Sequence, residues 1–176
     1  MKNLPYVFTF LACCIVNLAC SSITDGRETP FKSPVGQQET LLWNPEALHT
    51  RRQIEVSSVY DGDTFKTIQG ESIRMLGIDA PELASKWKER AEHQKGALKA
   101  KDRLRELIGG KTVDLVVPDE VPMDKYSRTL ALVFLAGDSV PVNARLLQEG
   151  LVRVLIIDDG EILNVEEWRQ LERAAL

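Results

Sequence analysis

The sequence predicts an α+β domain, a small β-barrel or sheet accompanied by helices. Three observations predict this class. Short strand-like runs recur between turn signals such as Asp61-Gly62-Asp63 and Gln69-Gly70. The stretch 91–108 has apolar residues at helical spacing and ends at Gly109-Gly110. Two further helical segments are expected near the C-terminus.

The expected elements follow one another in a simple order. The first three strands form an antiparallel meander whose second turn, at Gln69-Gly70, is a hairpin. In chain order the elements are strands at 54–60, 64–68 and 71–78, a helix at 91–108, strands at 111–117 and 128–135, a helix at 142–148, an extended segment at 151–157 and a helix at 161–175. The set suits a five-stranded partly open barrel of the OB type, although periodicity alone supports only the broader class.

Composition excludes several kinds of protein. The chain has 176 residues, enough for one domain and little more. Its net charge of −4 argues against tight non-specific DNA binding, which depends on many Lys and Arg contacts to phosphates. All 3 cysteines lie in the first 20 residues, so the rest of the chain has no disulfide framework or cysteine zinc site. With only 2 histidines, a histidine-based nuclease is not expected.

The N-terminal segment resembles an export signal. Residues 4–19 are mostly apolar and are followed by small residues. Ala19-Cys20 followed by serines resembles a lipoprotein cleavage site with Cys20 as the lipidated residue, and the alternative is a simple cleaved signal peptide. We therefore expect a signal at 1–20, a polar linker at 21–51 and the folded domain at 52–176. Within the linker, Trp43 and Leu41-Leu42 could dock on the domain, although nothing in the sequence requires it. The mature protein is expected outside the cytoplasm: periplasmic, secreted or anchored to the membrane.

Two aspartates are candidate metal ligands. Asp63 follows a turn and Asp79 ends a strand, so their carboxylates converge if the two strands are neighbours. Oxygen-only ligands suit Ca²⁺ or Mg²⁺. The alternative is that Asp61-Gly62-Asp63 only caps a turn.

Three further charged residues are candidates for chemistry on phosphate. Glu82 follows Pro81 and could act as a general base on a metal-bound water, or could be a solvated loop residue. Arg74 lies in an otherwise apolar strand and Arg128 opens the fifth strand. Each guanidinium could clamp a phosphate with two hydrogen bonds. For Arg74 the alternatives are a salt bridge to a nearby carboxylate or an exposed strand face.

The order and spacing of these residues resemble the staphylococcal nuclease family. The matching parts are Asp61-Gly62-Asp63-Thr64, Arg74 five residues before Asp79, Ala80-Pro81-Glu82, Asp124-Lys125-Tyr126-Ser127-Arg128, and the stretch 140–152. The resemblance covers roughly residues 52–176. It implies a five-stranded OB-type β-barrel with three helices, and a calcium-dependent nuclease that cleaves DNA and RNA and leaves 3′-phosphates.

The resemblance also implies a role for each matching residue. Asp63, Asp79 and the Ala80 carbonyl would bind Ca²⁺, Glu82 would activate water, Arg74 and Arg128 would hold the phosphate, and Lys125 and Tyr126 would contact the bound nucleotide. We expect a monomer with nucleic acid as its substrate. The alternatives are a barrel that binds nucleic acid at the cell envelope without effective catalysis, and a structural envelope lipoprotein.

The chain departs from the family pattern at three places. Ser127 stands where a glycine is usual, which matters only if its φ is positive. Ile156 and Asp158 stand where the family's type member has two tyrosines near the nucleotide. We therefore expect weaker stacking on the nucleotide base. The chain also ends at Leu176, where relatives usually continue.

Overall fold

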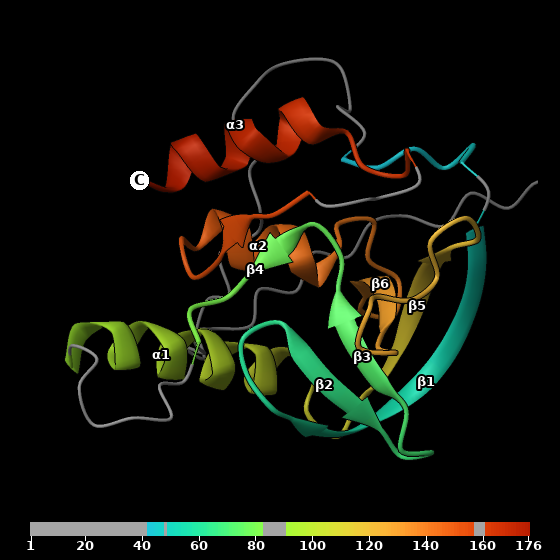
Figure 1. Ribbon diagram of the computed structural model, residues 1–176, viewed down its shortest axis with the longest axis horizontal. Coiled ribbons are helices and arrows are strands. Elements are labelled where there is room, and N and C mark those ends of the chain that lie inside the picture. The colour runs from blue at the N-terminus through green and yellow to red at the C-terminus, as the bar shows by residue number, and fades with distance from the viewer. Residues whose placement is uncertain (1–41, 48, 83–90, 157–160) are drawn as a thin grey trace, which may run out of the picture. The chain divides into compact units, whose positions relative to one another are not determined.

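The computed structural model describes residues 42–47, 49–82, 91–156 and 161–176 (Figure 1). The strands and helices are β1 (His49–Val59), β2 (Thr64–Thr67), β3 (Ser72–Met75), β4 (Ile78–Asp79), α1 (Ala91–Ile108), β5 (Thr112–Pro118), β6 (Thr129–Phe134), α2 (Val142–Gln148), β7 (Arg153–Val154) and α3 (Val165–Ala175). None of the helices in these ranges is long and apolar enough to cross a membrane.

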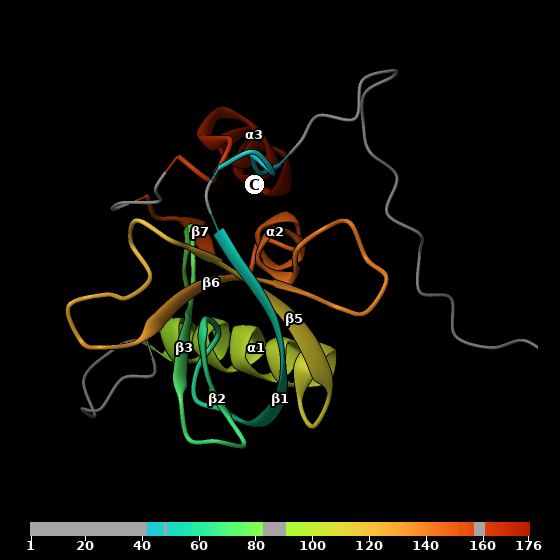
Figure 2. The same ribbon diagram turned by 90° about the vertical axis from the view of Figure 1, so that its right-hand side faces the viewer.

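Five strands close into a barrel in the order β1-β2-β3-β6-β5. Neighbouring strands are antiparallel except β3 and β6, which run parallel. Figure 2 shows β1, β2 and β3 side by side along one part of the barrel wall. This barrel and the three helices of the described ranges confirm the predicted α+β fold.

Helices α1 and α2 pack against the barrel through apolar side chains, whereas α3 packs against α2 and β7. On α1, Ala97, Ala100, Leu104 and Ile108 are fully buried. The short helix α2 contributes Asn143, which is also fully buried. Its side chain accepts a hydrogen bond from Val133 N at 3.0 Å and donates to Leu76 O at 2.9 Å. Asn143 therefore ties the end of β3 to β6, the parallel pair that carries one wall of the site.

The predicted strand at 71–78 is divided in the structure. Gly77 has a φ of +78°, and a Cβ there would lie 2.5 Å from Leu163 Cδ1. The chain turns at this glycine, so β3 ends at Met75 and the following residues form β4. Asp79 consequently lies in a separate two-stranded sheet, opposite Arg153 of β7. The last helix also starts later than expected, at Val165.

The folded unit starts before the predicted boundary at residue 52. Strand β1 already begins at His49, and Trp43 forms a β-bridge with Leu163. The indole Nε1 of Trp168 donates to Leu42 O at 2.6 Å. Residues that the sequence assigned to the linker thus form part of the domain. The predicted signal at 1–20 and most of the predicted linker lie outside the described residues.

Candidate active site

The turn between β1 and β2 places Asp63 by close packing. Asp61 Oδ1 accepts a hydrogen bond from Asp63 N at 3.0 Å, which closes the turn locally. A Cβ at Gly62 would lie 2.5 Å from Ala100 Cβ and 2.7 Å from Ala80 Cβ. Only glycine allows the turn to pack this closely between helix α1 and the chain that follows Asp79.

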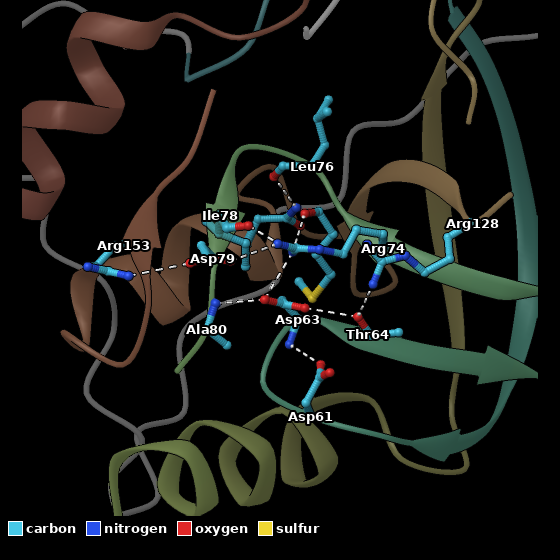
Figure 3. A network of polar contacts seen from close by, with 12 residues as sticks. Asp61, Asp63, Thr64, Arg74, Leu76, Ile78, Asp79, Ala80, Arg128 and Arg153 are labelled. Carbon is cyan, nitrogen blue, oxygen red and sulfur yellow. Dashed lines mark hydrogen bonds and ion pairs between the residues drawn. The ribbon is translucent and has the colours of Figure 1, made fainter. Parts of the chain in front are cut away.

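Asp63 is buried and fully engaged in polar contacts (Figure 3). Its Oδ1 accepts from Thr64 Oγ1 at 2.9 Å, and its Oδ2 accepts from Ala80 N at 2.6 Å. The same Oδ2 lies 3.0 Å from Arg74 Nη1. Burial raises the pKa of Asp63 to about 6, the charge of Arg74 opposes this shift, and Asp61 adds to it. A buried carboxylate of this kind favours the approach of a positive charge.

Arg74 is at the centre of the network and is only 9% exposed. Its Nη1 donates to Met75 O at 3.2 Å and to Ile78 O at 2.8 Å. Its Nη2 donates to Asp79 Oδ1 at 3.2 Å. The expected convergence of Asp63 and Asp79 is therefore present, and the group on which they converge is the Arg74 guanidinium. The salt bridge that the sequence offered as an alternative role for Arg74 exists in the structure.

A second arginine reaches Asp79 from the opposite side. Arg153 Nη2 lies 3.5 Å from Asp79 Oδ2, and the Arg153 side chain is 78% exposed. The two residues are 74 positions apart and meet because β4 pairs with β7. No local motif marks Arg153, and only the tertiary pairing of β4 with β7 reveals it.

Arg128 is held in place by the loop before β6. Its Nε donates to Asp124 Oδ2 at 2.7 Å, and Asp124 Oδ1 accepts from Arg128 N at 3.0 Å. Burial alone would raise the pKa of Asp124, but these hydrogen bonds and the Arg128 charge lower it below its ordinary value. Arg128 Nη1 donates to Thr64 Oγ1 at 3.4 Å, so Thr64 links Arg128 to Asp63. The sequence reasoning assigned no role to Asp124 or Thr64.

The residues between Asp124 and Arg128 form a tight loop with cations beside an aromatic ring. Ser127 has a φ of +61°, so the usual glycine has been replaced at a position that disfavours side chains. Tyr126 is 67% exposed. Lys125 Nζ lies 5.0 Å and Arg128 Cζ lies 5.4 Å from its centroid. The structure therefore brings the predicted substrate-binding residues next to Arg128.

Glu82 and Ile156 are less well defined by contacts with the rest of the site. Glu82 is exposed three residues after Asp79, and the structure records no polar contact between it and another described residue. Ile156 is partly buried and packs against the core, as an aliphatic side chain would. Asp158 lies outside the described residues.

The donor set suits a hard cation. Asp63 and Asp79 supply carboxylate oxygens, and Ala80 adjoins both. Within the described ranges no three His, Cys, Asp or Glu side chains gather closely enough to form a metal cage. Two carboxylates with carbonyl and water ligands would form an open, weak oxygen site, which fits Ca²⁺ better than a transition metal.

The structure is thus a closed five-stranded barrel with three helices in its described part, and paired carboxylates and arginines gather on one side of that barrel. Residues 72–176, more than half of the chain, match the model of the family described as staphylococcal nuclease homologue. The chain therefore belongs to the staphylococcal nuclease family.

Individual relatives agree with this assignment. Endonuclease YncB of Bacillus subtilis (strain 168) is 28% identical over 94% of this chain and 81% of the relative. Thermonuclease of Staphylococcus intermedius is 38% identical over 56% of each chain. The SPbeta prophage-derived endonuclease YokF of Bacillus subtilis (strain 168) is 31% identical over 69% of this chain and 40% of its own length.

Proposed function

We propose that this protein is a calcium-dependent nuclease that hydrolyses phosphodiester bonds of DNA and RNA and leaves 3′-phosphates. One observation carries the proposal: the buried Arg74 joins the buried Asp63 and the partly exposed Asp79 in a single network, to which Thr64 connects Arg128. Family membership and relatives named endonuclease and thermonuclease support the hydrolase class. The products, the RNA activity and the calcium requirement rest on the family resemblance and the oxygen donor set.

The two arginines act on the phosphate. Arg128 uses Nε and Nη2 to hold Asp124, while its Nη1 forms only a long hydrogen bond of 3.4 Å to Thr64 Oγ1. Nη1 can therefore also donate to a phosphate oxygen. Arg74 is fixed by backbone carbonyls and by two carboxylates, which hold its guanidinium in one orientation before the substrate binds. Positive charges that are already in position before the reaction stabilise the negative charge that develops on the phosphate oxygens in the transition state.

Calcium held by Asp63, Asp79 and the Ala80 carbonyl would supply positive charge to polarise the phosphate and acidify a bound water. Glu82 lies three residues beyond Asp79 on an exposed segment, where its carboxylate can accept a proton from the attacking water. Lys125 and Tyr126 stand on the exposed side of Arg128 and contact the nucleotide.

The proposal is tested by digestion of plasmid DNA and of RNA with calcium, with magnesium and with excess chelator. Cleavage with calcium alone, and its loss in Asp79→Ala, are expected. Lys99→Gln, an exposed change on α1, is the control and should cleave like the parent protein. Products that accept a label at the 3′ end only after phosphatase treatment carry 3′-phosphates. Undiminished cleavage in chelator refutes the calcium requirement, and binding without cleavage favours the catalytically inactive binding barrel.

We also propose that the protein is exported, with Cys20 as a lipid attachment site. The apolar stretch 4–19 and the Ala19-Cys20-Ser21-Ser22 run support this proposal. Cell fractionation should find the domain outside the cytoplasm, and Cys20→Ser should release it from the membrane. Protein retained in the cytosol with Met1 intact would contradict export.

A further inference from the structure

The outer face of β1, β2 and β3 continues beyond the catalytic residues. Side chains alternate between the two faces of a strand. Phe65 of β2 and Ile73 of β3 fill the barrel core, so their neighbours Thr64 and Arg74 lie on the opposite face of the sheet, where both are also buried. Thr64 and Arg74 are direct partners across the two strands. We call a row of directly paired residues across the sheet a rung, and the row of Thr64 and Arg74 the catalytic rung. The catalytic rung has a neighbouring rung on the same face of the sheet.

The neighbouring rung carries a lysine between two serines. Lys66 of β2 pairs with Ser58 on β1 and with Ser72 on β3. Side chains of directly paired residues lie on the same face, so Lys66 has short hydroxyl side chains on both sides. Within the described ranges Lys66 forms no ion pair with an acidic residue. Its charge is therefore available to an external anion.

An aromatic side chain adjoins this lysine on the same face. Tyr60 follows β1, its backbone N donates to Thr64 O at 2.9 Å, and the residue is 46% exposed. It therefore stands at the level of the catalytic rung. Lys66 Nζ lies 5.7 Å from the Tyr60 ring centroid. A cation and an exposed ring lie together beside Thr64 and Arg74, without any assigned role in the reaction.

We propose that Tyr60 and Lys66 form a second nucleotide subsite for a single-stranded part of the substrate. The Tyr60 ring stacks on an unpaired base, and the Lys66 ammonium binds the phosphate next to the one that is cleaved. Residues two apart on a strand are separated by about 6.6 Å, so the Lys66 rung lies roughly one nucleotide step from the Thr64 rung. The inference rests on the proposed nuclease function and extends it to the substrate's strandedness.

The chemistry of this face favours a single strand over a duplex. A ring can stack only on a base that is not already stacked in a helix, and such stacking contributes about 1–3 kcal/mol per base. The neighbouring Lys66 then adds a contact to the phosphate backbone of the nucleic acid, and the strength of this contact depends on the salt concentration.

The test is direct binding of a fluorescent 12-nucleotide single strand and of the matching duplex, measured in chelator so that nothing is cleaved. The variants are Tyr60→Leu, Tyr60→Phe, Lys66→Gln and Lys66→Arg, with Lys99→Gln on α1 as the matched control. Urea unfolding of each variant verifies that it folds. Where the parent protein cleaves, the KM for the 12-mer is compared with the KM for a dinucleotide.

We expect Tyr60→Leu and Lys66→Gln to weaken single-strand binding about five- to tenfold, with smaller effects on the duplex. Tyr60→Phe and Lys66→Arg should retain most of the affinity. Lys66→Gln should also reduce the salt slope by about 0.7, the value for one lost phosphate contact to a single strand. In cleavage the 12-mer KM should rise more than the dinucleotide KM.

Single-strand affinity within twofold of the parent protein in both Tyr60→Leu and Lys66→Gln would overturn the inference. An equal loss for single strand and duplex would overturn the base-stacking role of Tyr60. The proposed function fails separately: a parent protein that binds the 12-mer through Tyr60 and Lys66 but cleaves nothing with calcium would retain the subsite and lose the nuclease assignment.

Discussion

At the scale of single residues, Gly62 sets the position of Asp63. A methyl group there would meet the Cβ atoms of Ala100 and Ala80 at 2.5 and 2.7 Å, and neither is the end of a flexible chain. We expect Gly62→Ala to reduce the free energy of unfolding by about 1–3 kcal/mol, the usual cost of overpacking. Urea unfolding measures this loss.

The matched control for Gly62 is another glycine whose added methyl group has room. A Cβ at Gly96 on α1 would meet only Pro81 Cγ, at 3.8 Å. Since alanine favours a helix over glycine by about 0.5–1 kcal/mol, Gly96→Ala should leave stability unchanged or raise it. Equal effects of the two substitutions would contradict the packing argument.

The two arginines of the site should differ in their contribution to stability. Arg74 is buried against Asp63, so Arg74→Gln leaves a buried carboxylate without its partner and should cost about 3–5 kcal/mol. Arg128 forms a partly exposed pair with Asp124, whose carboxylate keeps its backbone donors, so Arg128→Gln should cost about 1 kcal/mol or less. Both variants should lose at least about a hundredfold in cleavage rate.

Urea unfolding beside plasmid cleavage separates these two roles. Similar stability losses in both variants would contradict the assignment of Arg74 as a structural as well as a catalytic residue. The sequence predicted both arginines from their place in motifs. It could not predict the burial of Arg74, because that depends on how the Asp63 turn packs against the chain at Ala80.

At the scale of elements, one polar cluster joins three strands. Glu71, immediately before β3, accepts hydrogen bonds from Arg52 of β1 at 2.9 Å and from Thr129 of β6 at 2.6 Å. The Arg52 hydrogen bond is the largest cause of a lowered Glu71 pKa, and burial opposes it. Because the pKa of Glu71 is lower in the folded protein, its ionised carboxylate stabilises the fold at pH values above the ordinary pKa of 4.5. This stabilisation is lost as the pH falls through the lowered pKa of the folded state.

We therefore expect Glu71→Gln to cost about 1 kcal/mol at pH 7, since the pair is partly exposed and screened. The difference from the parent protein should shrink as pH falls below 4.5, because the protonated carboxyl then resembles the amide. Urea unfolding across a pH series measures it, with exposed Glu55→Gln on β1 as the background for losing one carboxylate. A difference that stays constant down to pH 2 would contradict the role of the ionised Glu71.

Element boundaries were predictable where local periodicity decides them. Helix α1 and strand β6 match their predicted ranges closely because apolar spacing and turn residues mark their ends. The division of the 71–78 run at Gly77 was missed, because the contact that requires a glycine comes from Leu163, far along the chain. The pairing of β4 with β7, and with it Arg153, was hidden for the same reason.

At the scale of the whole molecule, the segment before β1 closes the fold against its C-terminal part. Trp43 lies edge-on to His49 with centroids 5.4 Å apart, and 5.7 Å from Phe134 of β6. Leu42 O accepts from the buried indole of Trp168 on α3. The sequence left open whether Trp43 and Leu42 dock on the domain, because only their tertiary partners show that this segment belongs to it.

The last prediction compares two shortened proteins, one starting at Leu42 and one starting at His49. The first retains every described contact and should unfold at the same urea concentration as the full chain. The second removes Trp43 from its aromatic neighbours and leaves the Trp168 indole without its acceptor, and should lose about 3 kcal/mol. In the full chain, Trp43→Ala should reproduce much of that loss and Trp43→Phe less of it. Equal stability of both shortened proteins would show that the domain starts at β1, because residues 42–47 would then contribute nothing to its stability.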